Sequence, residues 1–370
     1  MPHTSEPQVT NSRRSGLLER QIIIHVGHSK TGSSSIQQML TSERDRLERH
    51  GLLYPQSNIG LRNHRSLMFD VIGTVNFGTS VNTGLFIKMS AEEGGAMRKS
   101  ASEWRFFTRQ CNQSNAGTVL LSAEGLFGKL NRDGAARLKK RLEKIPHTCL
   151  RVVGYVRSPA LFYLSMVQQR LKGGHGLPAP KAFERAASIE SYRRNLGVHL
   201  EAKVFERHNL KNGDVVQDFL ERIGFSHFSP QVPPSVENES VSAEAMDVLS
   251  KLGADKSPVN QEELKRQRLL TRIVKRIDEL LPEPTKPVLR SEVAALVVHL
   301  NSDLLSLRDD YGLVFSDVDY DQASKGPEAV APKIETVADL CHFDTARSAD
   351  LQSAVMDKLQ KRGLSLGGLI

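Results

Sequence analysis

The sequence predicts an α/β fold in which a parallel sheet is flanked by helices, with a mostly helical C-terminal part. Between residues 22 and 207, short runs of β-branched and aliphatic residues recur, each typical of a strand buried on both faces. Segments with helical periodicity alternate with these runs, as expected when helical crossovers join parallel strands. Beyond residue 242 only helical patterns remain, separated by proline-bearing loops.

The predicted elements follow in order along the chain. Residues 22–26 form the first strand, and residues 33–49 carry apolar side chains at helical spacing with charges on the outer face. A short extended piece at 52–54 ends at Pro55. Further strands are predicted at 118–122, 150–156 and 202–207, and further helices at 96–113, 132–144, 159–172, 215–223, 243–252, 262–281, 291–307 and 349–361.

The chain divides into three parts. Residues 1–20 are polar and are expected to be a disordered N-terminal tail. Residues 21–316 are expected to form the α/β domain together with its helical C-terminal portion. Residues 317–370 are expected to provide a polar linker, a C-terminal helix and an apolar tail that docks on the chain's own core, with docking on a partner subunit as the alternative.

Composition limits the classes of function. The chain has 370 residues, 39% of them hydrophobic, enough for one large α/β core or two modest domains. Its formal net charge of +8 suits an anionic substrate, and no stripe of basic residues interleaved with aromatics indicates nucleic acid. No apolar run approaches the roughly 18 residues that cross a bilayer and no signal peptide is evident, so we expect a cytoplasmic protein without a transmembrane segment. Three scattered cysteines suit reduced thiols, not a disulfide framework or a zinc site.

The most informative stretch runs from the first strand into the next helix. A strand, a glycine-containing turn and a helix N-terminus present several unpaired backbone N–H groups at one point, with the positive end of the helix dipole behind them. A full positive charge and several hydroxyl donors lie in the same turn, from Lys30, Thr31, Gly32, Ser33, Ser34 and Ser35. This pattern predicts a phosphate site, against the alternative of a serine-rich turn with a solvated lysine.

A second strand-to-helix corner follows the predicted strand at 150–156. Ser158 is a good N-cap and Pro159 suits the first helical position. Arg157 lies at the carboxyl end of a buried strand, where open α/β sheets bind ligands, and Ser165 lies two helical turns after Ser158. A guanidinium and a hydroxyl together suit a second phosphate. The alternative is that Arg157 caps a carboxylate and Ser165 is a surface hydroxyl.

Both corners resemble elements of sulfotransferases that use 3′-phosphoadenosine 5′-phosphosulfate (PAPS). The order Lys30-Thr31-Gly32-Ser33-Ser34 resembles their 5′-phosphosulfate loop and differs from the nucleotide triphosphatase loop, whose lysine follows the second glycine. Arg157 with Ser165 eight residues later resembles their 3′-phosphate element. Weaker matches to bacterial members extend the resemblance over residues 21–250. The resemblance implies a P-loop-like sheet, PAPS as co-substrate, no metal, and a carbohydrate or glycolipid hydroxyl as acceptor; the oligomeric state stays open.

The resemblance also implies roles for individual residues. Lys30 would reach the bridging oxygen, the turn that follows it would hold the 5′-phosphate, and Arg157 with Ser165 would hold the 3′-phosphate. A general base must take the acceptor's proton. His64 is the first choice, because a histidine near this position is common in the resembling proteins, and Glu124 is the second. In the plainer alternatives, His64 is an ordinary polar surface residue and Glu124 caps a helix or supports a neighbouring group.

Two other functions stay open from the sequence. An ATP-dependent phosphotransferase of P-loop type would need magnesium, and the sequence lacks both its lysine placement and a clear aspartate after the second strand. A non-catalytic nucleotide-binding protein would keep the crevice without turnover.

Overall fold

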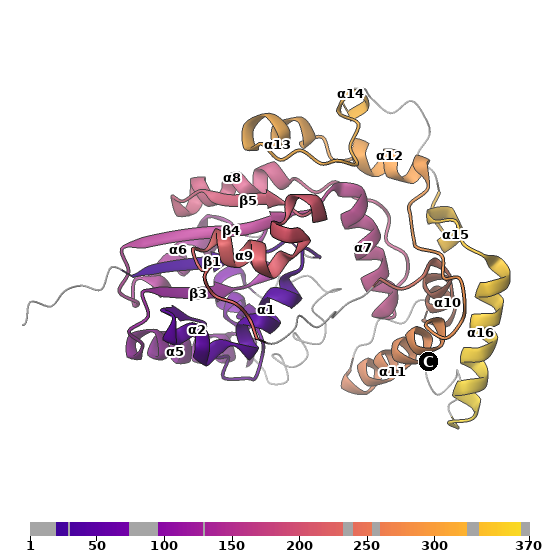
Figure 1. Ribbon diagram of the computed structural model, residues 1–370, viewed down its shortest axis with the longest axis horizontal. Helices are drawn as coiled ribbons and strands as arrows, with labels where there is room; N and C mark the ends of the chain where they lie inside the picture. The colour runs from indigo at the N-terminus through magenta and orange to yellow at the C-terminus, as the bar shows by residue number, and fades with distance from the viewer. Residues whose placement is uncertain are drawn as a thin grey trace, which may run out of the picture.

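A parallel β-sheet lies at the centre of the N-terminal part of the chain (Figure 1). The computed structural model describes residues 20–28, 30–73, 95–128, 130–231, 240–253, 260–323 and 333–363. Within these ranges five strands pair in the order β2-β3-β1-β4-β5, and every pairing is parallel. The strands are β1 Gln21–His25, β2 Leu52–Leu53, β3 Thr118–Ser122, β4 Cys149–Val156 and β5 Leu200–Val204. The prediction of an α/β fold with a parallel sheet flanked by helices is confirmed.

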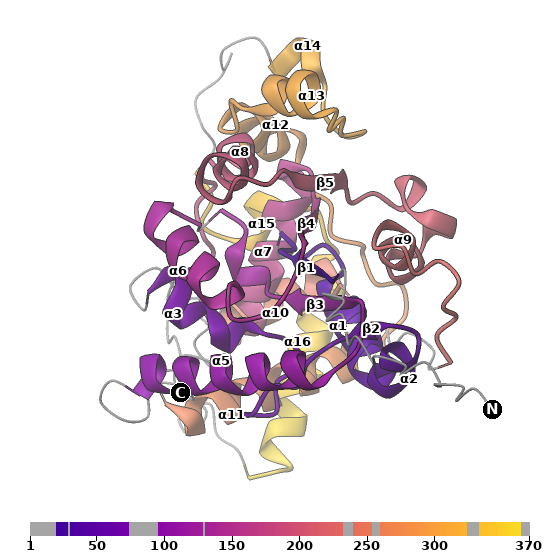
Figure 2. The same cartoon turned by 90° about the vertical axis from the view of Figure 1, so that its left-hand side faces the viewer.

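Helices cover both faces of this sheet (Figure 2). Ile22 and Ile24 of β1 face one layer, and Ile23 faces the other. All three isoleucines are fully buried, which explains why the strand reads as a continuous apolar run instead of an alternating one. The first layer contains α3 Met68–Ile72, α5 Gly95–Gln113, α6 Arg132–Leu142, α8 Arg185–Leu196 and α13 Leu304–Tyr311, and the second contains α1 Ser33–Ser42, α2 Arg44–Arg49 and α9 Val215–Arg222.

The order of the strands reverses at β1. The chain passes from β1 to β2 at one edge, returns to pair β3 with β1, and then pairs β4 with the other side of β1. In open parallel sheets, ligands bind at the carboxyl ends of the strands beside such a reversal. The residues that follow β1, β3 and β4 therefore meet at one crevice.

A group of helices packs beside the sheet and buries a core of its own. This core is formed by α7 Pro159–Lys172, α10 Ala243–Gly253, α11 Gln261–Asp278, α12 Ser291–His299, α15 Val337–Leu340 and α16 Thr345–Gln360. Helix α7 begins directly after β4 and lies between the sheet and helices α10, α11 and α16 (Figure 1). Its Val167 and Leu171 are buried in the helical core. No helix of the described ranges is long and apolar enough to cross a bilayer.

A buried ion network fastens α16 to α10 and α11. The Arg347 guanidinium donates to the Asp278 carboxylate at 2.8 Å and to the Glu244 carboxylate at 3.2 Å. It also donates to the carbonyl oxygen of Pro282 at 2.7 Å. All three charged side chains are less than a tenth exposed.

Two predicted helices are broken in the structure, so the predictions of continuous helices at 33–49 and 291–307 were wrong. At Glu43 the break between α1 and α2 is fixed by a buried carboxylate that accepts the backbone N–H of Gln231 at 2.7 Å. Between α12 and α13, Asn301 donates to the Val297 carbonyl and accepts from Arg185 at 2.7 Å. In both places a buried polar side chain bonds to a distant segment, which local periodicity does not reveal.

The ends of several elements also differ from the predictions. Strand β5 stops at Val204, and α16 begins at Thr345 because Asp344 caps it by accepting from the N–H groups of the second and third residues after it. The sequence did not predict α8, and a short helix, α14 Tyr320–Ala323, lies in the expected linker. Arg20, assigned to the disordered tail, is buried and donates to the Ala116 carbonyl at 3.0 Å. The rest of that tail and the apolar tail at 364–370 lie outside the described residues.

Replacing Arg347 by methionine should lower the free energy of unfolding by about 3–5 kcal/mol, because two carboxylates stay buried without their cation. Urea denaturation followed by circular dichroism measures this. The control is Arg193→Met, which removes an exposed pair with Glu190 and should leave the free energy of unfolding nearly unchanged. Equal losses in both variants would contradict the structural role of the network.

Candidate functional site

The turn between β1 and α1 has a backbone that few other sequences could adopt. Gly32 is left-handed with φ of 74°, and a Cβ there would lie 2.8 Å from Val215 of α9. A Cβ on Gly27 would lie 2.3 Å from the Ser33 hydroxyl. Lys30 is also left-handed, with φ of 69°, a conformation that costs a non-glycine residue free energy and that clusters at functional sites. The turn is therefore held in one shape by its neighbours.

The first turn of α1 is open to an anion. Its N-cap is Gly32, so no side chain caps the backbone N–H groups at this end of the helix. Those N–H groups and the helix dipole favour negative charge at this point. The Thr31 hydroxyl does not add to the cradle, because it is fully buried and donates to the His28 carbonyl at 2.6 Å.

A cavity of about 350 Å³ lies at the carboxyl ends of β1, β3 and β4. It brings together most of the site residues predicted from the sequence, which come from three separate stretches of the chain. Its lining also contains residues that the sequence analysis did not select. The predicted members are Lys30, Gly32, Ser33, Ser34, Ser35, Glu124, Arg157 and Ser165, and the additional ones are Arg65, Gln168, Gln169, Lys172 and Phe205.

Lys30 and Arg157 are neighbours in this cavity. The Arg157 guanidinium donates to the backbone carbonyl of Lys30 at 3.1 Å, and the Lys30 ammonium donates to the Gln169 side-chain oxygen at 2.6 Å. Burial lowers the pKa of Lys30; Glu124 opposes this change and Arg157 adds to it. The ammonium is thus held by a neutral amide, from which an anion can attract it at little electrostatic cost.

Three buried polar groups of the cavity have no hydrogen-bond partner within the described part of the chain. They are the Ser33 hydroxyl, Nε of Arg157 and Nε of Arg65. Burial also lowers the pKa of both arginines. Nearly all buried polar groups in folded proteins are hydrogen-bonded, so three unpartnered donors on residues of one cavity suit a polar ligand with several acceptor atoms.

Arg157 has a further neighbour in the segment that was predicted to be a linker. Asp317 accepts a hydrogen bond from the Ser158 hydroxyl at 2.7 Å and opposes the lowering of the pKa of Arg157. Burial raises the pKa of Asp317 itself. The carboxylate does not form a direct ion pair with Arg157 in the described structure, so the guanidinium keeps donors for a ligand.

His64, the first choice of general base, lies outside the cavity lining. It is buried, its Nδ1 accepts the backbone N–H of Ser122 at 3.0 Å, and its Nε2 donates to the Pro55 carbonyl at 2.8 Å. Its own backbone N–H donates to the Ser122 carbonyl at 2.8 Å. Both ring nitrogens are therefore engaged: Nδ1 fastens the 56–66 loop to the end of β3, and Nε2 bonds to Pro55 at the start of that loop. Glu124, the second choice, lines the cavity.

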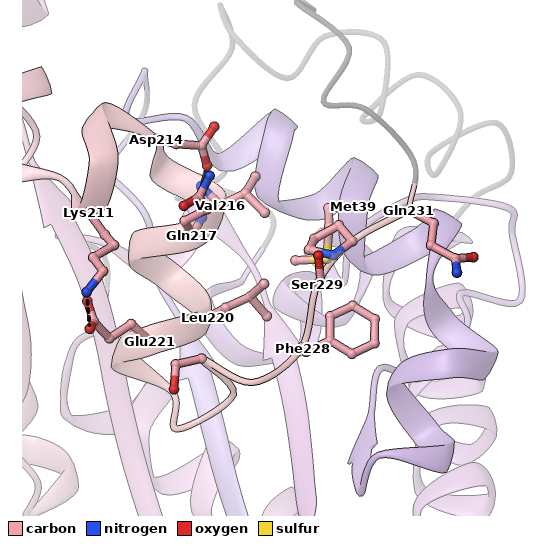
Figure 3. Close-up of a pocket in the computed structure, with 12 residues that line it drawn as sticks. Met39, Lys211, Asp214, Val216, Gln217, Leu220, Glu221, Phe228, Ser229 and Gln231 are labelled. Carbon is pink, nitrogen blue, oxygen red and sulfur yellow. Dashed lines mark hydrogen bonds and ion pairs between the residues drawn. The ribbon is translucent and has the colours of Figure 1, made fainter.

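A larger cavity of about 700 Å³ lies between α1, α9 and the chain at 226–231 (Figure 3). Its charged side chains already have partners. Lys211 pairs with Glu221 at 3.0 Å, and Asp214 caps α9 by accepting from Val216 and Gln217. None of its lining residues carries a buried polar atom without a partner. The cavity of about 350 Å³ is therefore the better candidate site, although the other cavity has twice its volume.

No protein-family model matches this sequence, and no curated protein matches it. The chemistry of the site is therefore inferred from its own residues. Within the described ranges, no three histidine, cysteine, aspartate or glutamate side chains lie close enough together to hold a metal ion.

The engagement of His64 predicts a pH dependence of stability. Burial lowers its pKa to about 4, and unfolding restores the ordinary value of 6.5. Between these values the unfolded state binds the extra proton, so stability is full above pH 6.5 and falls as the pH drops toward 4, by up to about 3 kcal/mol from this group. His25 acts with the same sign, because burial lowers its pKa to about 3.

Urea denaturation of a His64→Gln variant between pH 7 and 4 should show a shallower loss of stability than the wild-type protein. The exposed His199 provides the control, and His199→Gln should leave the slope unchanged. A slope unaffected by His64→Gln would contradict the buried, neutral state of this imidazole.

Proposed function

We propose that this chain is a sulfotransferase that moves a sulfuryl group from PAPS to an acceptor hydroxyl. The observation that carries the proposal is that the residues of the two predicted anion cradles line one cavity. One is the first turn of α1 with Lys30, and the other is Arg157 with Ser165. A nucleotide with phosphates on both the 5′ and 3′ positions of its ribose would occupy both cradles, whereas ATP has no group for the second.

In this proposal the donor's charges are met by the chain's own groups. The backbone N–H groups and hydroxyls of residues 33–35 hold the 5′-phosphate. Arg157 and Ser165 hold the 3′-phosphate. The Lys30 ammonium leaves Gln169 and moves to the oxygen that bridges phosphorus and sulfur, where negative charge grows as the bond to sulfur breaks.

Glu124 is the proposed general base. It follows the end of β3, it lines the cavity with Lys30, and no described residue forms a hydrogen bond with its carboxylate. The acceptor oxygen forms a bond to sulfur, the bridging oxygen leaves with the electron pair as part of adenosine 3′,5′-bisphosphate, and Glu124 takes the acceptor's proton. A carbohydrate or glycolipid hydroxyl is the acceptor class proposed here.

Isothermal titration calorimetry tests the nucleotide site. Adenosine 3′,5′-bisphosphate should bind the wild-type protein, and Arg157→Gln should weaken binding by about 10- to 100-fold, because charged hydrogen bonds to a phosphate are lost. The control is Arg207→Gln, an exposed arginine after the neighbouring strand β5, which should leave affinity unchanged. The proposal fails if the wild-type protein does not bind this nucleotide, or if it binds ATP with magnesium more tightly.

Transfer of radiolabelled sulfate from PAPS to a panel of glycans tests catalysis. Glu124→Gln should lower kcat by about 10²- to 10⁴-fold, the usual contribution of a general base, while affinity for adenosine 3′,5′-bisphosphate is retained. Full activity in Glu124→Gln would remove this residue from the mechanism. Nucleotide binding without transfer to any acceptor in the wild-type protein would favour a non-catalytic binding protein.

A further inference from the structure

Arg65 is a cationic residue of the cavity that has no role in either of the two proposed phosphate sites. It begins η1 (Arg65–Leu67), and its side chain lines the same cavity as Lys30 and Glu124. Its Nε is buried and has no hydrogen-bond partner among the described residues. Burial lowers the pKa of Arg65, so the free protein holds this guanidinium at an electrostatic cost. A ligand group with several acceptor atoms would relieve that cost.

The chain holds Arg65 firmly in place. The preceding residue, His64, is bonded to both the N–H and the carbonyl of Ser122 at the end of β3. The backbone N–H of Arg65 itself donates to the Asn63 side chain at 3.2 Å. These contacts fix the start of the arginine side chain beside the carboxyl end of the sheet, on the wall that the 56–66 loop supplies. His64 thus positions its neighbour.

Lys30, Arg65, Glu124 and Arg157 line the same cavity. Glu124 opposes the lowering of the pKa of both Lys30 and Arg65, whereas the carboxylate that acts on Arg157 is Asp317. Arg157 in turn touches the backbone of Lys30. Glu124 is thus the one carboxylate of this lining, and it acts on both Lys30 and Arg65. A donor whose 3′-phosphate lies at Arg157 and whose bridging oxygen lies at Lys30 directs its sulfuryl group toward Glu124 and Arg65.

We propose that Arg65 binds the oxygens of the sulfuryl group that is transferred. This inference rests on the proposed function. The sulfuryl oxygens share a negative charge, and a planar guanidinium matches two of them with parallel N–H donors. Arg65 is not simply the partner of the proposed base, because no ion pair joins Arg65 to Glu124 in the described structure. After transfer the sulfuryl group leaves with the acceptor, and adenosine 3′,5′-bisphosphate makes no contact with Arg65.

The proposal predicts that Arg65 distinguishes the donor from its product. Equilibrium binding of PAPS and of adenosine 3′,5′-bisphosphate is measured for the wild-type protein, Arg65→Gln and Arg157→Gln. Arg65→Gln should weaken PAPS binding by about 10-fold and leave the bisphosphate unchanged, because only PAPS carries the sulfuryl group. Arg157→Gln should weaken both nucleotides. The control is Arg62→Gln, an exposed arginine of the same loop, which should change neither.

The possible outcomes separate this inference from the proposed function. If the wild-type protein binds neither nucleotide, the proposed function fails. If both bind and Arg65→Gln weakens them equally or leaves PAPS unaffected, Arg65 does not bind the sulfuryl group and this inference alone fails. If Arg65→Gln does not fold, Arg65→Lys takes its place in the experiment. This variant keeps the positive charge but loses the planar pair of N–H donors. It should weaken PAPS binding by less than Arg65→Gln would, and it should leave binding of the bisphosphate unchanged.

Discussion

Positive charge in a partly buried cavity is the constraint on which the rest of the site depends. Four cationic side chains line the cavity against a single carboxylate, that of Glu124. Burial lowers the pKa of Lys30, Arg65 and Arg157, so each is held at some cost in free energy. The contacts that hold two of them in the free protein are neutral, a side-chain amide and a backbone carbonyl. A multiply charged anion relieves this cost, so the charges of the cavity are balanced only when such a ligand is bound.

The fold keeps these charges together by fixing the backbone beneath them. A side chain at Gly32 would collide with Val215 of α9 and with Phe205 after β5, so only glycine fits the turn after β1 in this packing. Arg157 directly follows the long interior strand β4, and the loop that carries Arg65 is bonded to the end of β3. On free loops, these cations would move apart because like charges repel. Attachment to three neighbouring parallel strands keeps them close together.

The sequence predicted the site residues that lie directly after a strand. Lys30, Glu124 and Arg157 each follow a strand, and parallel strands bring their carboxyl ends to one edge, so their meeting in one cavity follows from the sequence. The roles of His64 and Arg65 depend on hydrogen bonds to Ser122, 58 residues away from His64, which no periodicity reveals. Gln169 was within reach of prediction, because it lies one helical turn after Ser165.

Helix α7 has one consequence for the way this chain is built. One side of it supplies Ser165, Gln169 and Lys172 to the cavity, while the other side belongs to the helical core. Thr271 of α11 donates to the Lys172 carbonyl at 2.8 Å, so the end of α7 is capped by the helical part. The C-terminal helices are therefore not an interchangeable module. Swapping them for those of another protein would leave a complete sheet with one wall of its crevice unsupported.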